Sequence, residues 1–314
     1  MPMWEIGNSD DSRYAMDFKQ LHTFAVVAKE KSFTRAAEIL NYAQSSVSGQ
    51  IQALEQELGA PLFDRLGRGV MLTDTGRNIL PLVQSLFRIE EEIRAIAFGN
   101  KEPSGTLIVG APESLIAYRL SRMLSEFHKR YPKVHLHFQT GGCAEHRESL
   151  QRGEMDVAFL LEAPIVTDGL IMEHLVDERI LLVAEPRSPL SSMECIAPSD
   201  LAEQVFLMVE STKGGWSYRE IFEHQLIQAR VYPSKYMEFA SVEAVKQCAI
   251  SGVGIAILPE VVVRKELEER KLVALKWPAI VLPTQLAWNK DRWIPSAMQA
   301  FIRSVREFVG KQEA

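Results

Sequence analysis

Apolar side chains recur every three or four residues in three successive stretches near the start of the chain, which is the period of an amphipathic helix. The stretches predict helices over about 17–30, 34–40 and 44–58. Ser32 can cap the second helix through its hydroxyl, and Gly59 can end the third in a left-handed conformation. The predicted inner faces consist of Leu21, Phe24, Ala25 and Ala28, then Ala36, Ala37 and Leu40, then Val47, Ile51, Leu54 and Leu58.

Two short apolar segments follow, Leu62–Arg65 and Val70–Thr73, on either side of Leu66-Gly67-Arg68-Gly69. Glycines between two such segments predict a β-hairpin. A helix, a turn, a second helix and a hairpin together make a winged helix-turn-helix. The sequence therefore predicts a winged helix-turn-helix domain over residues 16–73.

The next apolar pattern predicts a helix from about Asp74 to Phe98, which is roughly 37 Å long at the rise of an α-helix. Pro81 should bend or loosen its first turns. The winged domain is too small to cover this length, so pairing with a second copy is favoured over packing on the following domain. The apolar positions are Ile79, Leu82, Val83, Leu86, Phe87, Ile89, Ile93 and Ile96.

Beyond the breaker-rich segment 99–105 the pattern changes to alternating strands and helices, which predicts an α/β fold with a parallel sheet. The order repeats after about 181–184. The last strand and helix, 284–288 and 295–309, have no partner in the second unit and should return to the first. The expected result is two subdomains, about 105–180 with 279–310 and about 181–278, joined by two crossings near 179–184 and 273–283.

The face of the third helix opposite Val47 and Ile51 has short or polar side chains that can enter a DNA major groove. A glutamine amide can pair with adenine, and serine hydroxyls can reach base edges or phosphates. A solvated face of an all-α domain is the alternative, and the hairpin and the helix cap favour DNA. The face consists of Ser45, Ser48, Gly49 and Gln52, with Arg65 and Arg68 of the hairpin beside the phosphates.

The overall charge does not by itself favour nucleic acid, because the formal net charge is −6. Residues 17–77 contain as many lysines and arginines as aspartates and glutamates. DNA affinity would therefore come from local placement of positive groups, helix N-termini and more than one copy of the domain. No apolar run is long enough for a membrane span. The acidic N-terminal residues do not resemble a secretion signal, so we expect a cytoplasmic protein.

Residues 1–15 should be a poorly ordered extension.

The motifs AAEIL, QSSVSGQIQALEQELG, PLFDRLGRGVMLT and TGR resemble the LysR-type transcriptional regulators. Later motifs of that family follow in order, namely YP at 131–132, GEMDVAF at 153–159 and SVEAVKQCAISGVGIAILPE at 241–260. The resemblance covers roughly 16–310. Gly49 departs from it, because relatives usually have a longer polar or basic residue there.

The resemblance implies a linker and dimerisation helix over 74–98, a hinge over 99–104 and an effector-binding domain over 105–314 that is similar to periplasmic solute-binding proteins. The implied partners are promoter DNA, a small-molecule effector and further copies in a homodimer or homotetramer, with RNA polymerase as an additional candidate. The DNA contacts are expected from Thr34, Arg35, Gln44, Ser45, Ser46, Ser48, Gln52, Arg65 and Arg68.

Ligands of open α/β sheets bind beyond the carboxyl ends of the strands. Free N–H groups and small hydroxyls at helix starts there suit a small organic anion. Ser114 and Ser241 can alternatively be plain helix caps, and Glu113 and Glu162 would repel a carboxylate if they faced the cleft. The expected effector contacts are Glu113, Ser114, Thr140, Gly141, Gly142, Ser211, Thr212, Ser241 and Val242.

Other chemistry has weaker support. Cys143 opens a helix, where a thiolate is favoured, so oxidant sensing is an alternative to effector binding. His135 and His137 share a strand face with no third ligand nearby, and we expect no metal and no cofactor. Trp216 and Tyr218 fit either ligand contact or core. Catalytic motifs are missing from the sequence, which argues against an enzyme, and a transport protein would have no use for residues 17–73.

Overall fold

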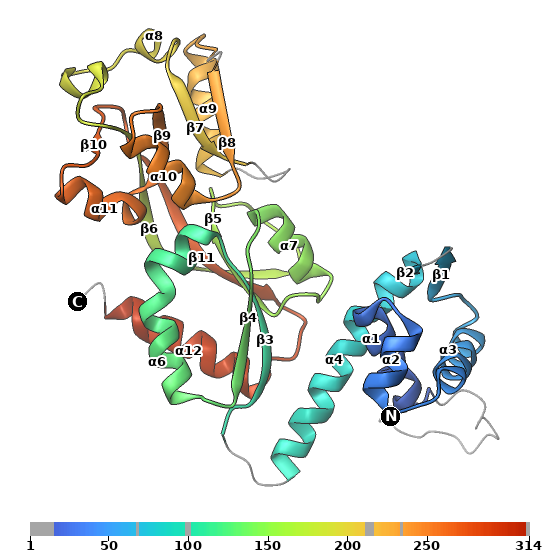
Figure 1. Cartoon of the computed structure of the whole chain (residues 1–314). Coiled ribbons are helices and arrows are strands. Elements are labelled where there is room, and N and C mark those ends of the chain that lie inside the picture. The colour runs from blue at the N-terminus through green and yellow to red at the C-terminus, as the bar shows by residue number, and fades with distance from the viewer. Residues whose placement is uncertain (1–15, 67–68, 98–101, 211–216, 233–234, 312–314) are drawn as a thin grey trace. The chain divides into compact units, whose positions relative to one another are not determined.

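The computed structural model describes residues 16–66, 69–97, 102–210, 217–232 and 235–311, without the side chains of 65–66, 69, 88, 91–92 and 94–97. The chain forms two compact units, one ending at Ile93 and the other beginning at Arg94 (Figure 1). The predicted extension at residues 1–15 and most of the predicted hinge at 99–104 lie outside the described residues.

The first unit has the predicted order of helices and hairpin. Its elements are α1 (Phe18–Glu30), α2 (Phe33–Leu40), α3 (Gln44–Leu58), β1 (Phe63–Leu66), β2 (Gly69–Leu72) and α4 (Asp74–Ala97). Local signals set the ends of the helices. The Ser32 hydroxyl accepts a hydrogen bond from the Arg35 N–H at 3.3 Å, and Gly59 ends α3 with a φ of 67°.

The core of the first unit holds the hairpin against α3. The Glu55 carboxylate accepts hydrogen bonds from the backbone N–H groups of Leu62 (2.7 Å) and Phe63 (3.2 Å), at the start of β1. Phe24 of α1 packs on Phe63 with a ring-centroid distance of 5.4 Å. These contacts fix the position of the hairpin relative to the third helix. The buried apolar residues are Leu21, Phe24, Val27, Ala36, Ala37, Val47, Ile51, Leu54, Leu62, Phe63 and Val83.

The long helix α4 has one covered side and one exposed apolar side. Val83 is buried, and Phe87 contacts the rings of Phe18 and His22 on α1. A stripe of apolar side chains at spacings of four, three and four residues is exposed to solvent. It consists of Leu82 (68% exposed), Leu86 (36%), Ile89 (43%) and Ile93 (60%).

The second unit is built on one mixed sheet in the order β4-β3-β5-β11-β6-β9-β7-β8, with β10 pairing to β6. The strands are β3 (Gly105–Gly110), β4 (Val134–Gln139), β5 (Val157–Leu161), β6 (Leu170–Ala184), β7 (Val205–Val209), β8 (Lys235–Phe239), β9 (Ile255–Pro259), β10 (Val273–Ala274) and β11 (Ile280–Asn289). The helices are α5 (Glu113–Leu115), the π-helix η1 (Ile116–Leu120), α6 (Ser121–Arg130), α7 (Cys143–Gln151), the 3-10 helix η2 (Pro189–Ser192), α8 (Pro198–Leu201), α9 (Tyr218–Gln228), α10 (Val242–Ile250), α11 (Glu260–Glu268) and α12 (Ser296–Gly310).

Two α/β subdomains share this sheet. We call β3–β5 with α5–α7 and α12 subdomain I, and β7–β9 with α9–α11 subdomain II. The strands are parallel within each set, whereas β11 pairs antiparallel with the first part of β6, over 170–180, and the two strands join the two sets. The end of the chain returns to subdomain I as predicted, because β11 pairs with β5 and Phe301 of α12 packs on Phe127 of α6.

Two features of the second unit go beyond the sequence pattern. The first crossing strand passes into subdomain II over 180–183, where it pairs with β9, but it already begins at Leu170, because the half-exposed residues before Leu175 pair with β11. The helical segment between β3 and β4 contains the π-helix η1, and the spacing of apolar residues does not indicate its wider turn. Both features affect how the subdomains meet.

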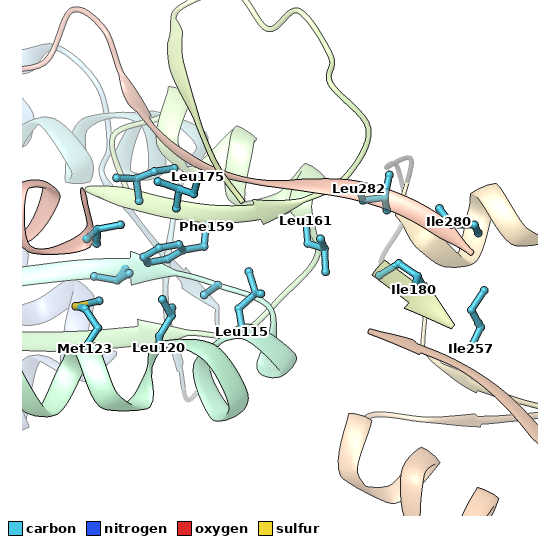
Figure 2. Packing of buried hydrophobic residues seen from close by; sticks show 14 of the residues in the cluster. Leu115, Leu120, Met123, Phe159, Leu161, Leu175, Ile180, Ile257, Ile280 and Leu282 are labelled. Atoms are coloured by element: carbon cyan, nitrogen blue, oxygen red, sulfur yellow. The ribbon is translucent and has the colours of Figure 1, made fainter. Parts of the chain in front are cut away.

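The apolar core continues from one subdomain into the other along the crossing strands. Figure 2 shows Met123, Leu120 and Leu115 beneath Phe159, and Ile180, Ile257 and Ile280 at the far end of the same cluster. The subdomains therefore share a packed connection of two strands.

Candidate functional site

The polar face of α3 is turned outward. Val47, Ile51 and Leu54 are fully buried, whereas the side chains on the other side are exposed, with Ser48 half-buried. Gly49 has open space around it, since a Cβ added there would meet nothing within 4 Å. Thr34 and Arg35 at the start of α2 are also exposed. The exposed polar residues of α3 are Gln44, Ser45, Ser46 and Gln52.

The N-terminus of α3 has no side-chain cap. Its N-cap residue is Ala43, whose carbonyl accepts from Ser46 and Val47, so the N–H groups of Gln44 and Ser45 have no acceptor within the helix. An exposed helix start of this kind attracts phosphate. It supplies local positive potential to a domain with balanced charge. The Arg65 side chain and Arg68 lie outside the described residues, so their expected phosphate contacts remain predictions.

A second site is a cleft of about 360 Å³ between the two subdomains. Its lining combines the ends of β3, β4 and β5 with the starts of α7, α9 and α10. Of the expected effector contacts, Glu113, Ser114, Thr140, Gly141, Gly142 and Val242 line it. Ser241 adjoins the lining through a hydrogen bond to Glu113 at 3.0 Å. Ser211 and Thr212 lie outside the described residues.

The helix starts at the cleft are already occupied by groups of the chain itself. The Glu113 carboxylate accepts hydrogen bonds from the Ser241 hydroxyl and from the Val242 N–H at 2.9 Å, across the two subdomains. The Glu145 carboxylate accepts from the Gly142 N–H at 3.3 Å at the start of α7. At α9 the Ser217 hydroxyl accepts from the Arg219 N–H.

This occupancy changes the expectation about the ligand. An organic anion was expected because helix starts offer free N–H groups, and here a carboxylate of the chain holds the starts of α7 and α10. Ser241 does not act as a plain cap, since its hydroxyl donates to Glu113 and makes no capping hydrogen bond within α10. These carboxylates weaken the physical basis for an anionic ligand at the two helix starts.

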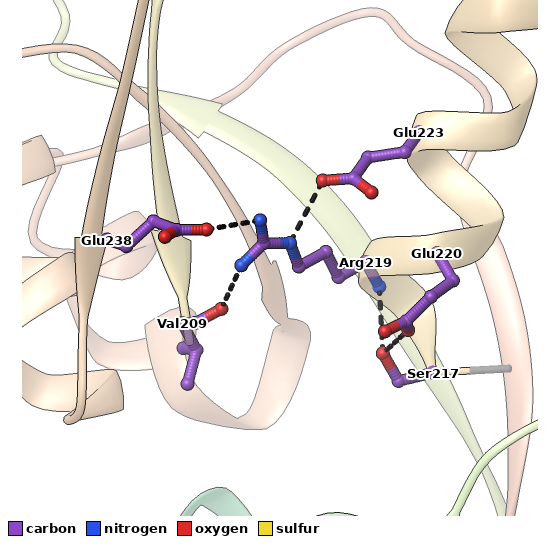
Figure 3. A network of polar contacts seen from close by, with 6 residues as sticks. All are labelled: Val209, Ser217, Arg219, Glu220, Glu223 and Glu238. Atoms are coloured by element: carbon purple, nitrogen blue, oxygen red, sulfur yellow. Dashed lines mark hydrogen bonds and ion pairs between the residues drawn. The ribbon is translucent and has the colours of Figure 1, made fainter. Parts of the chain in front are cut away.

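Among the described residues that line the cleft, Arg219 has the positively charged side chain, and its guanidinium is bound by groups of subdomain II. It donates to the Val209 carbonyl at 2.8 Å and pairs with Glu223 at 2.9 Å and with Glu238 (Figure 3). The Ser217 hydroxyl hydrogen-bonds Glu220 at the start of the same helix. Arg219 therefore organises the surface of subdomain II beside the cleft.

Cys143 lies at the start of α7 and lines the cleft, but its side chain is buried. Burial, followed by the negative charge of Glu162, raises the pKa of the Cys143 thiol to about 12. Glu162 is fully buried and forms an ion pair with Arg147, and burial also raises the pKa of its carboxyl. Desolvation therefore outweighs the helix start that favoured a thiolate in the sequence-based prediction.

The structure reveals a polar bridge between the subdomains that the sequence analysis missed. Lys246 of α10 donates to the Tyr118 hydroxyl at 2.9 Å and pairs with Glu243 and Glu266, each at 3.0 Å. The Tyr118 hydroxyl also hydrogen-bonds Glu243. The neighbouring Arg119 pairs with buried Glu178 of β6. The sequence contained one indication of this bridge. Lys246 lies between Val245 and Ala249 on the buried face of α10, where a charged side chain needs a partner.

Alternative sites receive no support from the part of the chain that the structure describes. His135 and His137 are exposed on the edge strand β4. Among the described residues no group of three or more His, Cys, Asp or Glu could hold a metal ion. A search of the same residues finds no helix long and apolar enough to cross a membrane.

Comparisons with known proteins match both units. Residues 18–77 match the family model "Bacterial regulatory helix-turn-helix protein, lysR family", and residues 100–310 match "LysR substrate binding domain". The chain is 38% identical to the uncharacterized HTH-type transcriptional regulator YwqM of Bacillus subtilis over 93% of this chain and 99% of that protein.

Solved structures share the same fold. The structure of ArgP from Mycobacterium tuberculosis has a TM-score of 0.74 at 20% identity and covers 92% of this chain and 96% of its own. Full-length CbnR in complex with its target DNA has a TM-score of 0.65 at 20% identity, with coverage of 93 and 99%.

Proposed function

Because this chain belongs to the LysR family of bacterial transcriptional regulators, we propose that it binds a specific promoter sequence through α3 and responds to a small molecule in the cleft between its effector subdomains. It would act as a homodimer or homotetramer in the cytoplasm, where promoter DNA lies. The exposed polar face of α3, beside an uncapped helix start, is the observation that supports the DNA contact.

The residues of this face have separate roles in the proposal. Gln52 is exposed near the middle of α3, and its amide can read a base edge in the major groove. Ser45 and Ser46 are exposed at the helix start, where N–H groups and hydroxyls suit phosphates and nearby base edges. Arg35 at the start of α2 can add a charged contact to the DNA backbone.

More than one copy is needed for useful affinity, since residues 17–77 contain as many acidic as basic side chains. A two-fold dimer places two recognition helices about one helical turn of DNA apart, or a multiple of it. Each copy then adds its own base and phosphate contacts. The exposed apolar stripe of α4 supports pairing at that helix.

The experiment is a gel shift of promoter DNA from next to the gene that encodes this protein, using the full chain. Gln52→Ala is expected to cost about 1–3 kcal/mol at one base-pair position and to relax the preference there. Gln299→Ala is the matched control, because it removes an exposed glutamine from α12 in the second unit. If Gln52→Ala left affinity and base preference unchanged, another face of the unit would have to contact DNA.

A further inference from the structure

The described charged side chains of the cleft lining are predominantly acidic. Glu113, Glu210 and Glu220 contribute carboxylates, and the single opposing charge among them is Arg219. Arg219 is bound by two further carboxylates, those of Glu223 and Glu238 (Figure 3). Within the described residues no hydrogen bond or ion pair reaches the Glu210 carboxylate, which is exposed. A ligand in this cleft therefore meets more negative than positive charge.

The helix starts do not offset this charge for an incoming anion. Glu113 accepts from the Val242 N–H at the start of α10, and Glu145 accepts from the Gly142 N–H at the start of α7, so a carboxylate of the chain already lies at each of these helix starts. An anionic ligand at the start of α10 would lie beside the Glu113 carboxylate. Like charges at such a distance disfavour binding.

A neutral polar group completes the lining. Ser114 is 2% exposed and borders the cleft, and no described residue hydrogen-bonds its hydroxyl. A serine hydroxyl at the cleft can both donate and accept a hydrogen bond, so it can orient a polar group of a ligand. The Glu113 carboxylate beside it accepts two hydrogen bonds at present, and an ionised carboxylate has about four acceptor sites.

We propose that the effector is a small organic cation, whose ammonium or guanidinium group is bound by Glu113 and Glu210 and whose adjoining polar group hydrogen-bonds Ser114. This inference rests on the proposed effector role of the cleft and names the chemical class of the ligand. The surroundings of Tyr218 in the same lining agree with a negative cleft. Burial, followed by the charges of Glu220, Cys143 and Glu113, raises the pKa of its hydroxyl.

The test compares ligands of similar length and different charge on the full-length protein. Cadaverine and agmatine carry ammonium or guanidinium groups, glutarate carries carboxylates, and pentanediol is neutral. Each is added at about 10 mM and constant ionic strength, and thermal unfolding is recorded. At about ten times Kd, cadaverine or agmatine is expected to raise Tm by about 3 °C, whereas glutarate and pentanediol have no effect.

Three variants locate the effect. Glu113→Gln/Glu210→Gln should lose the amine-dependent rise in Tm. Glu210→Gln alone, at an exposed position, should weaken it and serves if the double variant does not fold. Glu194→Gln is the matched control, because its side chain is 96% exposed and outside the cleft lining, so it removes the same charge and should keep the full rise.

Three outcomes would overturn the charge assignment: no rise with either amine, an equal rise in the double variant, or a rise with glutarate in the wild type. In the last case, loss of the glutarate effect in Lys213→Ala would assign recognition to that lysine, which lies outside the described residues. Promoter binding is measured separately. A protein that shifts promoter DNA but fails the amine test loses only this inference, whereas failure to shift DNA contradicts the proposed regulator.

Discussion

The environment of Cys143 illustrates how competing effects at one residue can be ranked. A helix start stabilises a thiolate, but the thiol is buried and lies near the negative charge of Glu162. Its pKa rises from 9.0 to about 12, which corresponds to about 4 kcal/mol against ionisation. The thiolate is the form that reacts with oxidants, so this site favours the effector role over oxidant sensing.

Because of this raised pKa, the free energy of unfolding should decrease as the pH rises in the alkaline range. The folded state favours the neutral thiol, so the contribution of Cys143 is fully present below the pKa of the unfolded thiol and is lost as pH rises towards 12. Between about pH 9 and 11, the free energy of unfolding of the wild type should fall by up to about 1.4 kcal/mol per pH unit more than that of Cys143→Ala.

Urea denaturation across this pH range measures the difference. Cys248→Ala is the matched control for the loss of a thiol, because it removes a half-buried thiol from α10 outside the cleft lining. Parallel pH profiles for the wild type and Cys143→Ala would show that the thiol does not have the raised pKa.

Residues of the cleft show the limit of local reasoning. The sequence placed Glu113 and Ser114 at the end of a strand, and both line the cleft. It could not show that the Glu113 carboxylate occupies the start of α10, because the two groups are 129 residues apart in the chain. The preference for an anion followed from treating that helix start as free.

At the scale of elements, the predictions were accurate where signals are local. The bounds of α3 agree with the predicted 44–58, since the apolar spacing defines the helix and Gly59 marks its end. The start of β6 was missed because its first residues are stabilised by pairing with β11, over a hundred residues later. The π-helix η1 was missed for a similar reason, as its side chains satisfy distant partners.

Helix α4 presents an apolar surface that a second copy of the chain can cover. Its stripe Leu82, Leu86, Ile89 and Ile93 is exposed, and burying it against a second copy would remove this apolar surface from water. Leu86→Glu/Ile93→Glu would bury charges in such a seam and should give monomers or insoluble protein. Molar mass by light scattering during gel filtration measures the result.

Gln84→Glu is the control for α4, because position 84 is about 180° around the helix from the stripe at 100° per residue. It should keep the wild-type mass. A soluble double variant that retains the wild-type mass would show that the oligomer forms through another surface.

At the scale of the whole second unit, two polar bridges join the subdomains beside the cleft. Glu113 binds the start of α10, and Tyr118 hydrogen-bonds Glu243 and Lys246 of the same helix. The connecting strands β6 and β11 share one core with both subdomains. A ligand changes DNA binding only through its different affinity for two arrangements, and these bridges stabilise the arrangement seen here.

The Tyr118 hydroxyl is the central group of the second bridge. Tyr118→Phe keeps the ring but removes hydrogen bonds to charged groups, at a cost of about 1.4 kcal/mol to the bridged arrangement. If this arrangement binds the ligand and is the minor one in the free protein, the ligand concentration at half response should rise about tenfold, with the same response at saturation. The measurement titrates the amine that stabilises the wild type into protein and promoter DNA. Tyr131→Phe, which loses a hydrogen bond to Arg303 within subdomain I, should keep the wild-type midpoint. Equal midpoints for wild type and Tyr118→Phe would show that this bridge does not affect the response.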